Sequence, residues 1–363
     1  RAVAGCLRRA TSPGRGGHGL SREADKIVFS AREELAALFG AENSSTIIFA
    51  NNATDALNIA LFGLLAPGDR AVTTSMEHNA VARPLRALED RGLNLEIVAC
   101  DKDGSLPLPA LRAALAAGAK AVVVTHASNV TGTIMPLAAI GRLARAAGAL
   151  FIVDAAQTAG AEPIDVTALG VDVLAFSGHK SLLGPQGTGG LYVRPGVMVS
   201  PLRFGGTGSQ SESDRQPEFY PDRLESGTPN TPGIAGLLAG IRYVIRQGID
   251  AIRAEEKEHT DALLSGLSTI GGARVFGPAP GSPRAAVVSF TVGDHDSGEV
   301  AHRLEHEHGI ACRGGLHCAP WAHRTIGTFA TGAVRFSPGC FTTKADIAAA
   351  LSAVRSIAAG RRG

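Results

Sequence analysis

Two side chains near the middle of this sequence, an amine and a carboxylate, could act together in catalysis. Asp154 follows the apolar run 149–153, and Lys180 comes shortly after a second apolar run, 171–176. Such runs indicate neighbouring parallel strands, and ligands of these sheets bind just beyond the carboxyl ends. The amine can form a Schiff base with an aldehyde, and a buried carboxylate can keep a pyridine nitrogen protonated. The pair therefore favours a pyridoxal 5'-phosphate (PLP) site over a helix cap and a solvated lysine.

Other polar residues follow further predicted strands. The segment 52–55, Asn-Ala-Thr-Asp, stands between a strand and a helix, where backbone N–H groups can bind a phosphate. Taken alone, it fits a plain helix cap equally well. His78 follows the predicted strand 71–74, and Asn129 follows the predicted strand 121–125. Each of them also fits a turn, but together they converge on one cleft.

A cysteine and an arginine in the last third narrow the chemistry. Arg335 lies in an apolar strand pattern. It predicts either a structural ion pair or a guanidinium that binds a substrate carboxylate, and we favour the second. Cys318 stands between glycines and a proline on a predicted loop, with His317 beside it and Arg313 nearby. Positive neighbours lower the pKa of a thiol and raise the fraction present as thiolate, so we expect Cys318 to be reactive.

From near residue 20 to the C-terminus, these motifs resemble the class V aminotransferase family of fold-type I PLP enzymes. The resemblance implies that Lys180 binds PLP and that Asp154 faces its pyridine nitrogen. It also implies that His78 stacks on the ring, and that Asn129 and Gln157 lie near the 3'-oxygen.

The same resemblance implies a phosphate site that two subunits share. It assigns Ala53 and Thr54 to the phosphate, with Ser177 and His179 beside it. Thr228 matches a position that reaches the phosphate of the neighbouring subunit. We therefore expect a homodimer.

The loop around Cys318 is similar to the sulfur-accepting loop of SufS-type (group II) cysteine desulfurases. The resemblance implies conversion of L-cysteine to L-alanine, with transfer of sulfur to Cys318 as a persulfide. Lys180, Cys318 and His78 would be catalytic, and Asn129, Arg313 and Arg335 would bind the substrate. A sulfur-acceptor protein and a role in iron–sulfur cluster assembly follow from this assignment.

Three alternatives stay open from the sequence. A selenocysteine lyase acting on L-selenocysteine would use nearly the same residues. A class V aminotransferase or a C–S lyase would keep the cofactor site without depending on Cys318. Outside enzymes, the chain could be an inactive partner in sulfur transfer.

Composition limits the other classes of function. The net charge of +2 over 363 residues argues against a nucleic-acid or anionic-membrane surface. Apolar runs are too short to cross a membrane, and we expect no signal peptide. The five cysteines are scattered, which favours a reducing cytoplasm.

The order of the predicted elements indicates an α/β fold. Strand and helix patterns alternate, which predicts a large domain, residues 1–248, with a mostly parallel seven-stranded sheet of the fold-type I kind. Residues 249–363 would form a smaller α+β domain carrying the Cys318 loop, and residues 1–20 could pack on it. A helical pattern from near residue 234 to beyond 256 would join the two domains. The glycine- and proline-rich stretch 205–230 predicts a long functional or interface loop.

Two further features need an interpretation. His302 and His306 match the H-x-x-E-H zinc motif, but both histidines should lie on the solvated face of their helix, so we expect no metal site. The chain begins with Arg and lacks the N-terminal strand and Asn-Ala-Ala-type segment that the family resemblance implies. We therefore expect a truncated N-terminus.

Overall fold

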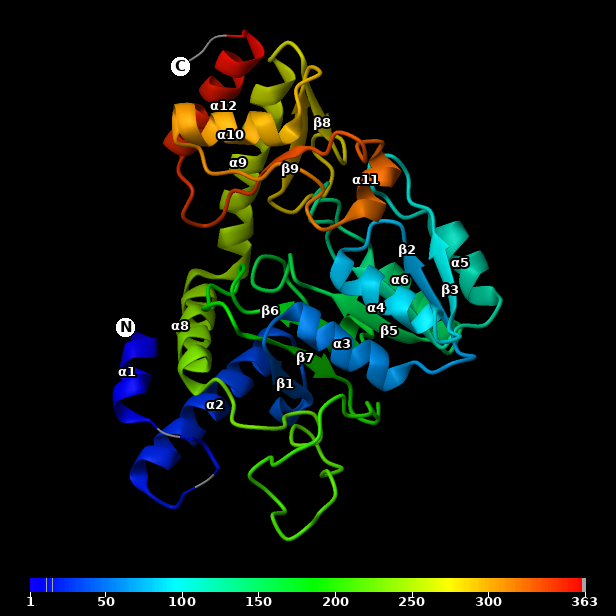
Figure 1. Ribbon diagram of the computed structural model, residues 1–363, viewed down its shortest axis with the longest axis vertical. Helices are drawn as coiled ribbons and strands as arrows, with labels where there is room; N and C mark the ends of the chain where they lie inside the picture. The colour runs from blue at the N-terminus through cyan, green and yellow to red at the C-terminus, as the bar shows by residue number, and fades with distance from the viewer. Residues whose placement is uncertain (11, 15, 361–363) are drawn as a thin grey trace.

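The computed structural model describes residues 1–10, 12–14 and 16–360. Across these residues the chain forms a seven-stranded sheet and a three-stranded sheet in two layers, one above the other in Figure 1. The large sheet has the strand order β1-β7-β6-β5-β4-β2-β3. Its strands are β1 (Ile47–Ala50), β2 (Arg70–Thr74), β3 (Asn94–Val98), β4 (Ala121–Thr125), β5 (Leu150–Asp154), β6 (Val173–Ser177) and β7 (Gly189–Val193).

The large sheet is mostly parallel, which confirms the predicted fold class. The pairs β3–β2, β2–β4, β4–β5 and β5–β6 are all parallel. Strand β7 runs antiparallel to both β1 and β6. A β-carbon added to Gly189, the first residue of β7, would lie 2.6 Å from the Asn52 Cα atom. Glycine at this position therefore lets the segment after β1 pass close to β7.

Helices cover both faces of the large sheet. On one face, Leu57 and Leu85 pack with strand residues such as Ile152. On the other face, Leu35 and Leu237 pack with strand residues that include Phe176. The helices of the large layer are α2 (Gly19–Leu38), α3 (Ala53–Leu64), α4 (Asn79–Glu89), α5 (Leu108–Ala116), α6 (Leu137–Ala146), α7 (Val166–Leu169) and α8 (Thr231–Gln247). Because both faces are covered, the strands are buried along nearly their whole length, except for the edge strand β3, where only Val98 is buried.

The small sheet has its own apolar core. Its antiparallel strands are β8 (Ala273–Phe276), β9 (Val288–Val292) and β10 (Val334–Phe336). Phe290 and Leu304 are fully buried in a cluster with residues of the covering helices. These helices are α9 (Ile249–Ser268), α10 (Ser297–His308) and α12 (Lys344–Ala358), while α11 (Pro320–Ile326) lies nearer to the large sheet (Figure 1).

The connection between the layers differs from the continuous helical pattern that we expected. Helix α8 ends at Gln247, and α9 begins at Ile249. Gly248 between them has a φ of 83°, a value that glycine adopts without strain. Helix α9 then runs from the large layer toward the small sheet (Figure 1).

The first helix, α1 (Ala2–Arg9), packs against α8 and α2 of the large layer. We expected residues 1–20 to pack on the small domain, but α1 packs on the large layer instead. In the described part of the chain, no helix is both long and apolar enough to cross a membrane.

Candidate active site

The carboxyl ends of adjacent parallel strands bring polar side chains to one edge of the large sheet. Thr125 at the end of β4 stands opposite Asp154 at the end of β5, and Ser177 ends the next strand, β6. They line a narrow cavity of about 40 Å³. Its lining residues are Ala53, Thr54, His78, Ala80, Thr125, Ala127, Asn129, Asp154, Ala156, Gln157, Ser177 and Lys180. Eight of the predicted cofactor residues are therefore together in one place.

One end of the cavity is formed by the N-terminus of α3. Asn52 caps this helix by accepting a hydrogen bond from the Asp55 backbone N–H. The Ala53 N–H donates to the Ser177 hydroxyl oxygen over 3.2 Å, which ties the helix to the end of β6. Backbone N–H groups and hydroxyls at a helix N-terminus can bind an anion such as a phosphate. The exposed Thr54 lies in this first turn.

At the base of the cavity, the buried carboxylate of Asp154 lies with the half-buried amine of Lys180. The Asp154 side chain is only 3% exposed, and its Oδ1 accepts the Ala156 N–H over 2.9 Å. Burial lowers the pKa of Lys180 from its ordinary value. Asp154 acts in the opposite direction, and the charge of Arg335 lowers the pKa further. Lys180 therefore holds its proton less tightly than a surface lysine does.

His78 has a fixed orientation because it caps helix α4. Its Nδ1 accepts the Ala80 N–H over 3.0 Å, so in the neutral ring the proton lies on Nε2. Burial lowers the pKa of His78; Asp154 partly opposes this, and Lys180 is one of the cations that lower it further. Near neutral pH the cavity is thus lined by a neutral, oriented imidazole.

The loop that carries Cys318 is fastened above the cavity by two backbone carbonyls. The Asn79 N–H donates to the carbonyl oxygen of Cys318 over 2.8 Å. The side-chain amide of Asn129 donates to the carbonyl oxygen of His317 over 2.7 Å. Both loop residues have positive φ, 49° for His317 and 57° for Cys318, and the Cys318 side chain is exposed. The left-handed backbone costs conformational energy, which the two anchors offset.

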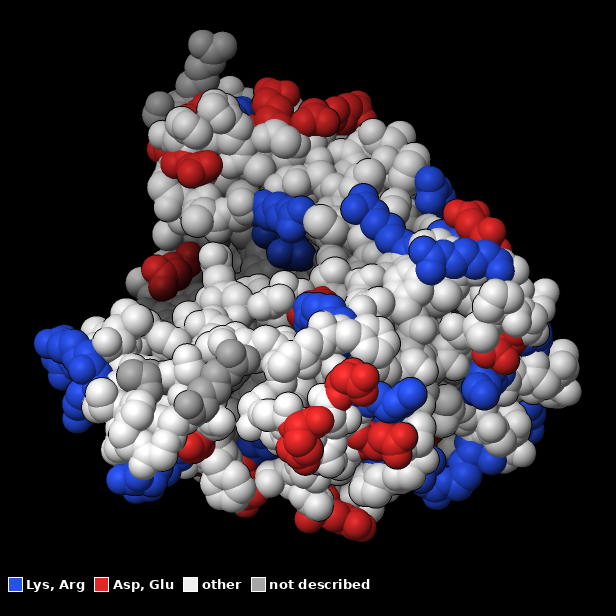
Figure 2. Space-filling view, turned by 60° about the horizontal axis from the view of Figure 1, so that its bottom comes forward, with Lys and Arg blue, Asp and Glu red and all other residues white. Residues whose placement is uncertain are grey.

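Two arginines, Arg313 and Arg335, lie near this loop on backbone segments that pair with each other. The Nη2 of Arg313 lies 3.2 Å from the sulfur of Cys318. The Nη1 of Arg335 donates to the carbonyl oxygen of Asn129 over 2.9 Å, and its Nε has no hydrogen-bond partner within the described residues. Arg335 also lines an open cleft of about 660 Å³ together with Lys180. Figure 2 shows the hollow between the two layers, with basic side chains above it.

His317 does not act on the thiol as the sequence led us to expect. Its side chain is 1% exposed, and its ring lies 5.4 Å from that of His323, measured between centroids. Burial, followed by the charge of Arg335, lowers the pKa of His317 to about 3. It is therefore neutral at physiological pH, and Arg313 is the cation that contacts the Cys318 sulfur. His317 and Cys318 are adjacent in sequence, but their side chains point to opposite sides of the loop.

Two predicted cofactor residues lie apart from the cavity within the same chain. His179 is exposed, and among the residues that the structure describes it is not one of those lining the Lys180 cavity. Burial and the adjacent Lys180 lower its pKa. Thr228 lines a different cavity of about 490 Å³, together with Asp55 and Arg203.

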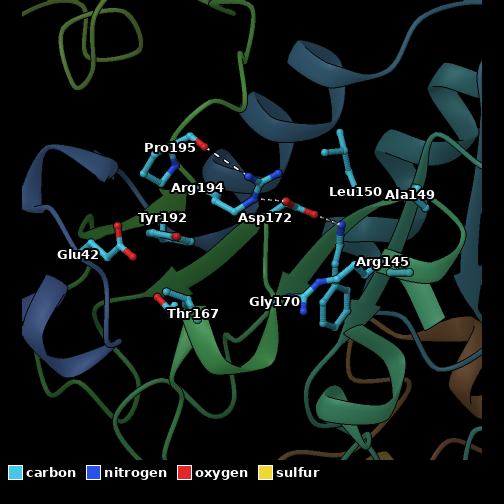
Figure 3. A pocket seen from close by; sticks show the side chains of 14 residues that line it. Glu42, Arg145, Ala149, Leu150, Thr167, Gly170, Asp172, Tyr192, Arg194 and Pro195 are labelled. Carbon is cyan, nitrogen blue, oxygen red and sulfur yellow. Dashed lines mark hydrogen bonds and ion pairs between the residues drawn. The ribbon is translucent and has the colours of Figure 1, made fainter. Parts of the chain in front are cut away.

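Another cavity, of about 590 Å³, lies at the opposite edge of the large sheet (Figure 3). Its central carboxylate, Asp172, accepts hydrogen bonds from the Phe151 N–H and from Arg194. This carboxylate ties the start of β5 to the end of β7, which explains it as a structural group.

The histidines of the H-x-x-E-H motif lie on α10. Their rings stack 3.9 Å apart, and the Nδ1 of His306 is 3.0 Å from the carbonyl oxygen of His302. No cluster of three or more potential metal ligands occurs among the residues that the structure describes.

Sequence and structure comparisons give a consistent set of relatives. The family model of aminotransferase class-V matches residues 6–350. A probable cysteine desulfurase of Methanothermobacter thermautotrophicus is 36% identical over 340 residues, covering 92% of this chain and 84% of the relative. A cysteine desulfurase of Serratia proteamaculans is 38% identical over 315 residues, covering 84% and 76%. The apo structure of a cysteine desulfurase from Thermococcus onnurineus superposes with a TM-score of 0.92 at 33% identity, covering 99% of this chain and 92% of that one.

Proposed function

Because the chain belongs to the class V aminotransferase family, we propose that it is a PLP-dependent cysteine desulfurase. It converts L-cysteine to L-alanine and retains the sulfur on Cys318 as a persulfide. The observation that carries this proposal is the exposed Cys318 thiol beside Arg313, on a loop fastened to the rim of the Lys180 cavity. An aminotransferase without sulfur chemistry does not need a thiol there.

The residues at the cavity fit PLP. A buried carboxylate, Asp154, suits a protonated pyridine nitrogen, and the half-buried amine of Lys180 suits the aldehyde. The α3 N-terminus with Thr54 and Ser177 suits the phosphate, and the neutral ring of His78 suits a stack on the pyridine. When bound, PLP supplies an electron-accepting ring that stabilises negative charge at the substrate Cα.

Two side chains, Arg335 and Lys180, and the backbone of Asn129 prepare L-cysteine for reaction in this proposal. Arg335 binds the substrate carboxylate, because its guanidinium reaches the cleft that Lys180 also lines. The backbone carbonyl oxygen of Asn129 keeps Arg335 in place by accepting a hydrogen bond from its Nη1–H. Lys180 Nζ moves the proton at the substrate Cα, and its lowered pKa favours the neutral amine that accepts it.

Cys318 then takes the sulfur. Its thiolate attacks the substrate sulfur, so an S–S bond forms while the substrate C–S bond breaks. The carbon keeps the electron pair of the broken bond and takes up a proton, which yields alanine. The Arg313 guanidinium stabilises the negative charge on the attacking sulfur from 3.2 Å.

The test uses the purified protein, loaded with PLP and incubated with L-cysteine. Wild type should release alanine and accumulate persulfide, and Cys318→Ala should bind PLP but accumulate none. Cys312→Ala and Cys340→Ala are matched controls, because burial raises the pKa of both thiols and should keep them unreactive. Unchanged cysteine desulfuration by Cys318→Ala would instead favour a C–S lyase.

Several finer points belong to the same proposal. We assign the chain to the SufS-type subgroup, with a sulfur-acceptor protein that meets the exposed Cys318 and a role in iron–sulfur cluster assembly. The five free cysteines support a cytoplasmic location. We also propose two domains that meet at Gly248, since α8 packs in the large layer and α9 in the small one.

A homodimer is the proposed assembly. Thr228 is exposed and lines a cavity with Asp55 at the outer side of the α3 N-terminus, away from the Lys180 cavity of its own chain. Phe204, in the same long loop region, is 74% exposed and presents an apolar ring to a partner. A two-fold dimer would cover this surface and bring Thr228 to the partner's phosphate site.

A further inference from the structure

A second carboxyl group lies behind the cofactor cavity, and the chemistry described above does not use it. Glu77 is in the turn between β2 and α4, one residue before His78, and its side chain is 0% exposed. Its Oε1 accepts a hydrogen bond from the Thr74 hydroxyl over 2.6 Å. The same hydroxyl oxygen accepts the Met76 N–H, which directs its proton toward Glu77. Oε2 has no hydrogen-bond partner among the residues that the structure describes.

This environment favours a protonated carboxyl. A buried carboxylate with so few donors is strongly disfavoured, because nothing replaces its lost hydration. Burial raises the pKa of Glu77 to about 8. The Thr74 hydroxyl and the backbone of Thr125 and Thr74 lower it in part, and the charge of Asp154 on β5 raises it. The other titratable groups near the turn are His78 on α4 and the thiol of Cys100, whose pKa is raised to about 11.

The turn that contains Glu77 holds both halves of the site. At its start, the Ser75 hydroxyl accepts hydrogen bonds from the Cys100 N–H over 2.9 Å and from the Thr325 hydroxyl of α11 over 2.8 Å. At its end, His78 faces the cavity, and the Asn79 N–H binds the carbonyl oxygen of Cys318. A change at Glu77 therefore bears on the cofactor side and on the thiol loop at once.

We propose that Glu77 is a positioning residue that works as a neutral acid, packing the turn closed and leaving Asp154 as the negative carboxyl group beside the cofactor. Loss of its proton would place a second anion in the same buried region. Water would have to enter to solvate that anion, and the turn with His78 and Asn79 would shift. The proposal rests on the proposed function only where it names the cofactor and the thiol.

The first experiment measures the charge of Glu77 directly. Infrared difference spectra of the PLP-loaded protein at pH 6.5 should show a protonated-carboxyl band that Glu77→Gln removes. Glu42→Gln, which changes an exposed glutamate at the opposite edge of the sheet, is the matched control and should keep the band. A wild-type spectrum with no band attributable to Glu77 would overturn the proposal.

The second experiment follows thermal unfolding between pH 5 and pH 8. The folded state raises the pKa of Glu77 above its ordinary value of 4.5. The contribution of protonated Glu77 to the free energy of unfolding is therefore complete below pH 4.5 and is lost as the pH rises toward about 8. Relative to Glu77→Gln, the unfolding constant of wild type should rise by up to about tenfold per pH unit in this window. Parallel pH dependences for the two proteins would contradict a neutral Glu77.

The third experiment tests positioning rather than folding. The visible absorbance of the bound cofactor and the rate of desulfuration should change near pH 8 in wild type, and this change should be absent in Glu77→Gln, because glutamine has no proton to lose. A change near pH 8 that persists in Glu77→Gln, despite the infrared band, would overturn the positioning role. The infrared and unfolding measurements need no desulfurase activity, so their outcome is independent of the proposed reaction.

Discussion

The Nη2 atom of Arg313 lies within hydrogen-bond distance of the Cys318 sulfur, at 3.2 Å. Its position is set by the backbone, because Arg313 pairs with Arg335 in an isolated antiparallel bridge next to β10. The same backbone pair therefore presents one guanidinium to the thiol and the other to the cleft shared with Lys180. In the proposed function, this arrangement links sulfur transfer at Cys318 and carboxylate binding by Arg335 through a single structural element.

The first prediction concerns this contact. Arg313→Gln removes the charged donor to the sulfur, so alkylation of Cys318 by iodoacetamide at pH 7 should slow by about two- to fivefold, the range of an exposed charge contact. Arg324→Gln is the control, because that guanidinium stacks on Phe329 instead. Equal rates in wild type and Arg313→Gln would show that the contact does not activate the thiol.

The second prediction concerns the cofactor bond. Wild type loaded with PLP should absorb at about 410–430 nm, as Schiff bases of this cofactor do. Borohydride should fix the cofactor to Lys180, and peptide mass spectrometry should find it there. Lys180→Ala should lose both signals, since the cavity then holds no amine. A labelled peptide that lacks residue 180 would contradict the assignment.

The third prediction concerns the assembly. Light scattering at micromolar concentration should find a dimer, and Thr228→Ala should weaken PLP binding by about tenfold or more through loss of a hydrogen bond to a charged group. Ser211→Ala, at an exposed position in the same long loop, should bind PLP like wild type. Full activity in a monomer would exclude a shared site.

The fourth prediction concerns acid stability. Burial lowers the pKa of His126 and of His323 to about 4, and that of His317 to about 3. These values lie below the ordinary histidine pKa of 6.5. The contribution of the neutral rings to the free energy of unfolding is therefore complete above about pH 6.5 and is lost as the pH falls toward 4. Each histidine should contribute about 1.4 kcal/mol per pH unit in that window.

His126→Gln tests this acid sensitivity, because glutamine can keep a hydrogen bond to Thr158. Thermal unfolding from pH 7 to pH 4 should show a shallower loss of stability than in wild type. His295→Gln, at an exposed position, should leave the slope unchanged. An identical slope for His126→Gln and wild type would mean that His126 has the same pKa in the folded and unfolded states.

Much of the fold and part of the site could be predicted from the sequence. Apolar runs that end in polar residues indicated the strands that carry Asp154 and Lys180, and the mostly parallel sheet is confirmed. The antiparallel strand β7 was not identified, because its first two residues are glycines that serve close packing rather than strand propensity. The break at Gly248 was missed as well, since the apolar pattern continues on both sides of it.

Side-chain direction on irregular loops was the main source of error. His317 is adjacent to Cys318, and adjacency suggested a cation beside the thiol. The positive φ of both residues turns the His317 side chain into the core and the Cys318 side chain to solvent. Because an irregular loop has no repeating pattern of buried and exposed positions, the sequence does not indicate these directions. Glu77 was missed for a related reason, because a glutamate after a strand usually faces water.

The segment from Arg313 to Cys318 is held at both ends, which has an evolutionary consequence. The segment is held at one end by the pairing of Arg313 with Arg335 and at the other by the bond from the Asn79 N–H to the Cys318 carbonyl. Its length is therefore fixed by the distance that it spans, and two of its residues are constrained as well. A β-carbon on Gly314 would lie 2.4 Å from the Ser297 carbonyl oxygen, and Gly315 has a φ of 102°. In descendants of this sequence, an insertion or deletion would separate the thiol from the cavity in one step.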